Sequence, residues 1–451
     1  MTRILGPLFA ATLAALAACG DTLVDHGATD IQRGPGNAVC DPLDPSLISC
    51  REGGKDFCAK ESIQYCGGGC LDCRGFPAPG GGVAACLGEG TGAGVCGYEC
   101  TGGLLKCTQG GTPACCTAEA VAAGPAHTCA LATGGGLFCW GDNSAGQVTG
   151  TASASPVKSP VKVFDSGVVA VATGPGRTCA ARAEDVYCIG AGPATTHAAA
   201  GVTALAVGAS HACGIVGSTG AVQCWGSGDA AGGGSPVAAG ATAIAAGADH
   251  TGAVVATGVQ CWGTNTSGQL GNDSTTSSAT PVTAIVAGIV GVTASGNHTC
   301  ATAGLSNGQG VDDVVRCWGD EPGAPFLLAP LQTTPGIPMR DATHSVVRSN
   351  VDRLSTGATH VCVQRVAEAI LCFGRDNAAG QLGGPSADPA TEIVQVGGSL
   401  AAKAFASGGD HSCAVFPDKT VHCWGRNDLG QLGDGTVTTP TIGVLVPVSG
   451  R

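Results

Sequence analysis

Residues 408–433 read GGDHSCAVFPDKTVHCWGRNDLGQLG, and variants of this run occur seven times after residue 120. Each copy contains Gly-x-x-His-Thr-Cys-Ala or a close variant, a Gly-rich gap and Cys-Trp-Gly. The fuller copies continue with Asn-x-x-Gly-Gln-Leu-Gly. Self-similarity of this kind is typical of repeat proteins, in which each copy buries a face against its neighbour. The sequence therefore predicts a repeat architecture.

The spacing of the copies favours β-structure. Their first cysteine positions, with Gly252 in that place in the fourth copy, lie 50, 34, 39, 48, 62 and 51 residues apart. This is the size of a four-stranded propeller blade with variable loops. The chain is only 12% charged and rich in Gly, Thr and Val, so it lacks the charged i, i+4 pairs that support exposed helices.

The two cysteines of a copy flank a Gly-rich turn. In the first copy the run 134–136 is central, and a hairpin turning there would place the cysteines opposite each other within disulfide reach. Each bridge would contribute about 2 to 3 kcal/mol in the chain-entropy model and would fix the register of its hairpin. The predicted pairs are Cys129 with Cys139, Cys179 with Cys188, Cys213 with Cys224, Cys300 with Cys317, Cys362 with Cys372, and Cys413 with Cys423.

Cys261 is predicted to be unpaired, because Gly252 stands where the other copies have their first cysteine. The 26 cysteines divide into one near the N-terminus, twelve between Cys40 and Cys116, and thirteen in the repeats. Six pairs leave one cysteine over in the repeats. A buried thiol is favoured over an intermolecular bridge, which stays open.

The motifs of residues 261–271 and 423–433, together with Gly-x-x-His-Thr-Cys-Ala, resemble the repeats of the regulator of chromosome condensation family. The resemblance covers roughly residues 118–451 and implies an all-β, seven-bladed β-propeller. The second copy departs from the pattern at Arg177 and Ile189 and the sixth at Phe373, so seven blades require the second copy to form one. The family's nucleotide exchange on a nuclear GTPase is not carried over, because this chain begins like a bacterial export substrate.

Residues 1–18 read as a lipoprotein signal peptide: an apolar stretch ends in Leu-Ala-Ala-Cys, in which Cys19 is the predicted lipidation site. An ordinary secretory leader and an uncleaved anchor are the alternatives. Residues 19–39 would be a tether. The predicted location is the bacterial cell envelope, lipid-anchored and extracytoplasmic, at the outer membrane or cell surface rather than freely secreted, with membrane attachment through the lipid alone.

Residues 40–117 form a predicted small, cysteine-rich domain held by disulfides whose connectivity the spacing does not reveal. Zinc is the rival interpretation, because some of these cysteines have ligand-like spacing: Cys66, Cys70, Cys73, Cys96 and Cys100. Residues 118–451 would form the propeller of seven repeats.

Three repeated polar or aromatic positions invite a functional interpretation. One histidine per repeat suggests a recurring structural hydrogen bond more than a ring of metal ligands, and the five tryptophans suggest core more than a ligand-binding aromatic cage. The loop amides suggest turn chemistry more than a recognition surface. These residues are His127, His211, His250, His298, His360 and His411; Trp140, Trp225, Trp262, Trp318 and Trp424; Asn143, Asn265, Asn427, Gln147, Gln269 and Gln431.

The net charge of −12 argues against nucleic acid, which requires clustered Lys and Arg. No linear catalytic motif occurs, so no catalytic residue, cofactor or metal is predicted. Calcium at residues 268–273 or 430–435 is a minor alternative, because carboxylates there lie beside Gly-rich turns without EF-hand spacing.

The sequence therefore predicts a monomeric, surface-anchored binding scaffold whose face loops engage an unknown protein or glycan. The alternative is a propeller-based lyase or hydrolase with a non-linear active site. We also expect a C-terminal strand near residues 443–448 to close the ring by completing the blade that begins near Ala120.

Overall fold

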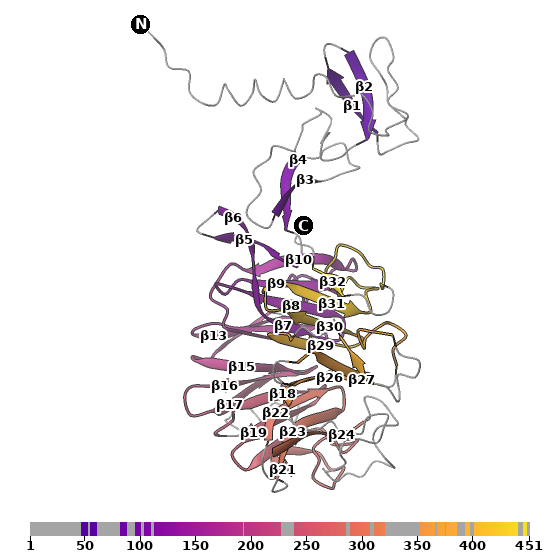
Figure 1. Cartoon of the computed structure of the whole chain (residues 1–451). Coiled ribbons are helices and arrows are strands. Elements are labelled where there is room, and N and C mark those ends of the chain that lie inside the picture. The colour runs from indigo at the N-terminus through magenta and orange to yellow at the C-terminus, as the bar shows by residue number, and fades with distance from the viewer. Residues whose placement is uncertain are drawn as a thin grey trace. The chain divides into compact units, whose positions relative to one another are not determined.

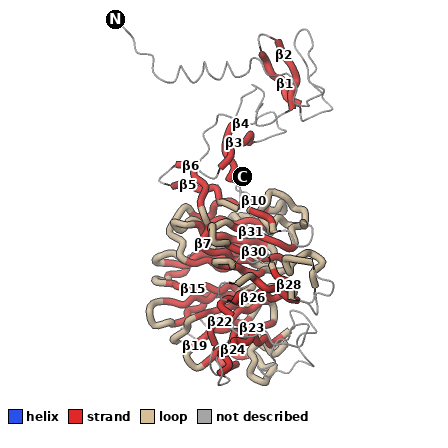
Figure 2. The backbone as a smooth tube through the Cα atoms, viewed as in Figure 1, coloured by secondary structure: helices blue, strands red, loops and turns tan. Residues whose placement is uncertain are grey.

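The computed structural model describes residues 47–52, 55–60, 82–87, 95–100, 103–109, 112–192, 194–226, 239–285, 289–306, 311–320, 351–365, 368–374, 376–385, 393–396, 401–440 and 445–448. The chain divides into two compact units, residues 1–100 and 101–451. Figure 2 shows only strands and loops in the described part. None of the described residues forms a helix of the length and apolar character that crossing a membrane requires.

Two antiparallel hairpins are described in the first unit. One pairs β1 (Leu47–Glu52) with β2 (Lys55–Lys60), and the other pairs β3 (Gly82–Leu87) with β4 (Val95–Cys100). Cys19, Cys66, Cys70 and Cys73 lie outside the described residues, so lipidation and the predicted domain boundaries stay predictions.

The second unit is the predicted all-β, seven-bladed propeller with disulfide hairpins inside the blades, and this prediction is confirmed (Figure 1). Successive sheets follow chain order, and their innermost strands contact one another around a closed ring. These strands are β7 (Ala118–Ala123), β11 (Ala170–Gly174), β15 (Val202–Val207), β18 (Ala243–Ala246), β22 (Ile289–Ser295), β25 (Val351–Thr356) and β29 (Ala404–Ser407).

The second and third strands of each blade carry the repeated motifs. The second strands are β8 (His127–Ala132), β12 (Arg177–Ala181), β16 (His211–Val216), β19 (His250–Val255), β23 (His298–Ser306), β26 (His360–Arg365) and β30 (His411–Val415). The third strands are β9 (Leu137–Gly141), β13 (Asp185–Gly190), β17 (Ala221–Gly226), β20 (Gly258–Gly263), β24 (Val311–Gly319), β27 (Ile370–Gly374) and β31 (Val421–Gly425). Along these strands successive side chains are mostly buried, without the alternation of apolar and polar residues that a half-exposed sheet shows. The reason is that neighbouring blades cover both faces of a blade.

Five blades have a described fourth strand: β10 (Val157–Phe164), β14 (Thr195–Ala198), β21 (Ser278–Ile285), β28 (Val394–Gln395) and β32 (Val446–Pro447). The expectation that the C-terminal strand completes the first blade was wrong. β32 pairs with β31 in the seventh blade, while β10 supplies the outer strand of the first. The described strands of each blade are thus continuous in sequence, and the ring is closed by hydrogen bonds and side-chain packing between the last and first blades.

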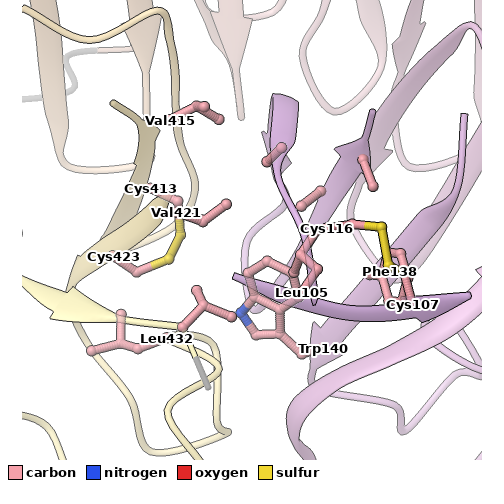
Figure 3. Packing of buried hydrophobic residues seen from close by; sticks show 14 residues of the cluster. Leu105, Cys107, Cys116, Phe138, Trp140, Cys413, Val415, Val421, Cys423 and Leu432 are labelled. Atoms are coloured by element: carbon pink, nitrogen blue, oxygen red, sulfur yellow. A yellow bond between two sulfur atoms is a disulfide. The ribbon is translucent and has the colours of Figure 1, made fainter. Parts of the chain in front are cut away.

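The junction between the last and first blades has a packed apolar core. Figure 3 shows Trp140 of the first blade between Leu432 of the seventh and Leu105 of the preceding hairpin. That hairpin consists of β5 (Leu105–Gln109) and β6 (Thr112–Cys116), and the Cys107–Cys116 disulfide links its two strands. The segment before the first blade therefore belongs to the core that closes the ring.

The strand directions give the propeller two distinct faces. The hairpin face carries the turns between second and third strands, such as residues 133–136 and 416–420, and the starts of the innermost strands. The motif face carries the turns between first and second strands, such as residues 124–126, and the Gly-Gln-Leu-Gly loops. The repeated residues thus gather at the motif face and the variable turns at the hairpin face.

Candidate functional site: blade junctions and a cavity on the hairpin face

The structure pairs the repeat cysteines within their blades. Each of the six pairs occupies directly opposed positions on the second and third strands, with Cα atoms 4.0 to 4.1 Å apart. The pairs are Cys129–Cys139, Cys179–Cys188, Cys213–Cys224, Cys300–Cys317, Cys362–Cys372 and Cys413–Cys423. Cys100, a ligand in the zinc alternative, is also disulfide-bonded.

Cys261 is a free, buried thiol opposite Gly252. Burial raises the pKa of this thiol to about 12, so it stays protonated and poorly reactive. A Cβ atom built on Gly252 would lie 3.3 Å from the Cys261 sulfur, and its other nearest neighbours are side-chain methyl groups at 3.5 and 3.8 Å. The fourth blade therefore has room for the bridge that its relatives carry.

Replacing Gly252 by cysteine should form a seventh disulfide in this series, because the two positions oppose each other as in the other blades. We expect a gain of about 2 to 3 kcal/mol in the free energy of unfolding. Thiol titration of the denatured, unreduced variant should find one thiol fewer than in the wild type. Gly252→Ser is the matched control, and an unchanged thiol count together with unchanged stability would contradict the prediction.

The repeated histidines join neighbouring blades by hydrogen bonds, which confirms their structural interpretation. Each Nε2 atom lies 2.7 to 2.8 Å from a Thr or Ser hydroxyl of the next blade. The pairs are His127–Thr178, His211–Thr251, His250–Thr299, His298–Thr356, His360–Ser412 and His411–Thr128. The last of them closes the ring.

The proton positions follow from the partners of the hydroxyls. Thr178 donates its single proton to the Gln147 carbonyl at 2.7 Å, so it must accept the Nε2 proton of His127. The Nδ1 atom of His127 then carries a lone pair, and it is buried without a partner. It packs against Gly124, where an added Cβ would lie 2.9 Å from Nδ1. The Gly-x-x-His spacing thus lets the neutral imidazole pack against the glycine backbone, where any side chain would clash with it.

Burial holds these imidazoles in the neutral form. Loss of solvation lowers the pKa to about 4 for His127, His211 and His360, and to about 3 for His250 and His411. Each of the six imidazoles makes a hydrogen bond at its own blade junction. None of them lines the cavity described below. They are therefore positioned to stabilise the ring rather than to exchange protons with a ligand.

One junction in the described part of the ring lacks the histidine–hydroxyl bond. In the second blade Arg177 replaces histidine and donates to the Ala191 carbonyl of its own blade at 2.7 Å. In the third blade Ala212 occupies the position of the hydroxyl residue. His197 stacks on Trp225 across this junction instead, with ring centroids 5.5 Å apart. Both partners of the usual bond are thus missing together.

The tryptophans pack between blades, and four of the five are buried: Trp140, Trp262, Trp318 and Trp424. Three donate their indole N–H to a glutamine carbonyl in the Gly-Gln-Leu-Gly loop of the preceding blade, at 2.8 to 3.0 Å. Trp225 is partly exposed and follows a blade without that loop. The core interpretation is confirmed for the four buried rings.

The loop amides are also used internally. The Oδ1 atom of Asn427 accepts from the Leu432 N–H at 3.0 Å, and its Nδ2 donates to oxygens of the following turn. Gln431 Oε1 accepts from the Leu429 N–H at 2.7 Å. Asn143, Asn265, Gln147 and Gln269 have equivalent backbone partners and are buried. The amides shape the loops and are not displayed for recognition.

A cavity of about 610 Å³ opens on the hairpin face between the sixth, seventh and first blades. Its charged lining comes from the starts of three inner strands and the turn 416–420: Glu119, Asp352, Arg353, Lys403 and Lys419. Lys403 and Lys419 make no ion pair with any described residue. No repeated motif contributes these residues, so sequence reasoning missed them, and only the ring topology brings them together.

Comparison with known families identifies the repeats. Residues 119–147, 258–302 and 402–431 match the regulator of chromosome condensation (RCC1) repeat. Together with the blade geometry, these matches define the class as a disulfide-linked repeat propeller. The chain is a seven-bladed β-propeller that contains RCC1-type repeats.

Several solved structures are similar to this chain at low identity. Yeast RCC1 (Prp20), solved with Kap60 bound, is 17% identical with a TM-score of 0.41, over 73% of this chain and 74% of that one. Human WBSCR16 is 16% identical with a TM-score of 0.43, over 76% and 88%. The Physcomitrella patens receptor kinase CR4 ectodomain is 19% identical with a TM-score of 0.40, over 69% and 74%. Scores this low carry no argument about function. Comparison with curated proteins gives no match.

Proposed function

We propose that this chain is a surface-anchored, extracytoplasmic binding scaffold whose propeller engages a partner through its hairpin face. The observation that carries the proposal is a contrast between the polar residues of the repeated motif and the charged residues that line the cavity. The repeated His, Asn and Gln side chains are buried and bonded within the protein, whereas the cavity on the hairpin face is lined by charged groups, of which Lys403 and Lys419 make no ion pair with a described residue. Variable loops on a rigid ring are a common setting for binding sites.

The disulfides support an oxidising location. Seven bridges are described between residues 107 and 423, and cytosolic reductants would keep such thiols reduced. In this proposal residues 1–18 direct export, lipid on Cys19 holds the chain, and a cysteine-rich segment precedes the propeller unit.

Anchoring is tested by growing cells with an alkyne analogue of palmitate. The wild-type chain should incorporate the analogue and remain with the membrane fraction. Cys19→Ser should lose the label and leave that fraction, because it removes the thiol that accepts the diacylglyceryl group. Cys261→Ser serves as the control and should label like the wild type. Unlabelled wild-type protein would contradict the lipoprotein assignment.

Partner binding is tested by affinity capture. The full oxidised chain is immobilised and exposed to solubilised envelope from its own cells, and bound species are identified by mass spectrometry. We expect one saturable partner that is lost when Lys403 is changed to glutamate and retained when Lys158, on the motif face, is changed in the same way. Recovery of no saturable species by correctly oxidised, cooperatively melting protein would overturn the scaffold proposal.

A further inference from the structure

We propose that the cavity on the hairpin face is a carboxylate-binding site that receives an acidic segment of a partner protein. This inference deepens the proposed function and rests on it, because it names the chemistry by which the hairpin face would recognise its partner. Three cationic side chains, Arg353, Lys403 and Lys419, line the cavity in a chain whose net charge is −12. Cationic side chains are thus concentrated at this cavity, although the chain as a whole is acidic.

Arg353 is held in place before any ligand arrives. Its Nη1 atom lies 3.1 Å from the Ala402 carbonyl of the next blade, 3.5 Å from Gln364 Oε1 and 3.5 Å from Asp352 Oδ2, with which it forms an ion pair. Gln364 is buried and donates in turn to the Glu368 carbonyl at 3.0 Å. These contacts use part of the guanidinium, whose five N–H groups match the two oxygens of a carboxylate. A positioned fork of this kind loses little conformational entropy on binding.

Lys419 occupies a backbone conformation that favours glycine, with φ at +65°. Its N–H donates to the Phe416 carbonyl at 2.8 Å, and its own carbonyl accepts from the Ala118 N–H at 2.8 Å. The turn and the first blade thus hold the residue there, at a cost of about 1 kcal/mol or more relative to glycine. Strain of this kind is found at ligand-binding positions. Here it places an ammonium group at the cavity that glycine would not supply.

Lys403 completes the cationic side of the cavity from the seventh blade. Its N–H pairs with the Val415 carbonyl at 2.7 Å, which fixes the start of that inner strand. Its side chain is exposed and has no ion-pair partner among the described residues. An ammonium group already paired would have to break that pair before binding. The free cations of Lys403 and Lys419 are available at once.

The remaining lining favours a protein segment over a glycan. None of the described lining residues is aromatic, whereas an aromatic platform would cover the apolar face of a sugar ring. Glu119 and Asp352 add two carboxylates beside the cations, and these can accept hydrogen bonds from the backbone N–H groups of a peptide. A carboxylate side chain of the partner would pair with the cations of the cavity, and the N–H groups of the neighbouring peptide bonds would donate to Glu119 and Asp352.

A fluorescein-labelled hexaglutamate peptide is the probe, and its anisotropy is measured with the full oxidised chain at low ionic strength. We expect saturable binding that weakens as salt rises. Arg353→Ala and Lys403→Glu should each weaken binding at least about tenfold. Lys419→Gly should weaken it about threefold or more without lowering the melting temperature, because glycine relieves the positive φ. Lys158→Glu, the matched charge reversal on the motif face, should leave affinity unchanged.

The outcomes separate this inference from the scaffold proposal. Hexaglutamate binding unchanged by Lys419→Gly and Lys403→Glu, or tighter binding of trigalacturonate than of hexaglutamate, would overturn the carboxylate–protein inference. If the envelope partner is still captured by the Arg353 and Lys403 variants, the scaffold stands and the cavity is not its contact. If the probe binds as expected but the envelope yields no partner, the cavity chemistry stands and the scaffold proposal fails.

Discussion

Replacing Trp140 by alanine is expected to lower the free energy of unfolding by about 3 to 5 kcal/mol, the range for removing a fully buried large aromatic side chain. Trp140 has no exposed surface, and its indole N–H donates to the Gln431 carbonyl at 2.8 Å. Gly433 packs directly on the ring, at φ +70°, where an added Cβ would lie 2.7 Å from the indole nitrogen. The loop of the last blade thus encloses the ring, and a cavity left there cannot collapse easily.

The matched control is Trp225→Ala, which changes the same residue type at the same repeat position. Trp225 is partly exposed and stacks on His197 instead of entering a Gly-Gln-Leu-Gly loop, so we expect a clearly smaller loss. Urea denaturation followed by far-UV circular dichroism measures both. Equal losses for the two variants would show that ring closure does not depend on the enclosed indole.

Acidification is expected to unfold the propeller between pH 6.5 and about 3. Five buried histidines have their pKa lowered in the folded state to about 4 or 3, whereas in the unfolded state they titrate near 6.5. Below pH 6.5 the unfolded state therefore binds more protons, and stability falls as pH falls. The stability is fully present above pH 6.5. Each histidine contributes up to about 1.4 kcal/mol per pH unit within its window.

The dependence on individual histidines can be measured with His127→Gln. This variant starts less stable, but its loss of stability per pH unit between 6 and 4 should be smaller than the wild-type loss by up to about 1.4 kcal/mol. His422→Gln is the comparison: burial also lowers the pKa of His422, but this imidazole is only partly buried and belongs to no junction pair, so we expect a smaller change of slope. Urea midpoints recorded across this pH range would contradict the interpretation if they stayed flat, or if both variants kept the wild-type slope.

The sequence alone predicted the features that repeat. Cysteines flanking a short Gly-rich turn face each other in an antiparallel hairpin, so Cys129 and Cys139 could be matched without a structure, and Gly252 indicated the free thiol of Cys261. The spacing between successive repeats likewise predicted the blades, because each blade is one continuous stretch of sequence. Local spacing carries this information because a hairpin is a local structure.

Features that depend on ring closure could not be predicted in this way. His411 bonds to Thr128 across 283 positions of sequence, and nothing near either residue identifies the other. The outer strand of the last blade was assigned to the first blade, because the order of strands within a blade is not encoded in the repeat motif. The cavity escaped prediction since Glu119, Asp352 and Lys403 come from blades that meet only when the ring is closed.

The two ends of the second unit meet at one residue of the last blade. The Val421 N–H donates to the Gly103 carbonyl at 2.9 Å, and the Val421 carbonyl accepts from the Val448 N–H at 3.1 Å. Since every blade is continuous in sequence, no strand has to cross from one end of the chain to the other. A short covalent link between these ends would make a circular polypeptide of the second unit taken by itself. Its new termini could then be opened between the second and third blades, where the histidine–hydroxyl bond is already missing, giving a circular permutant with every blade intact.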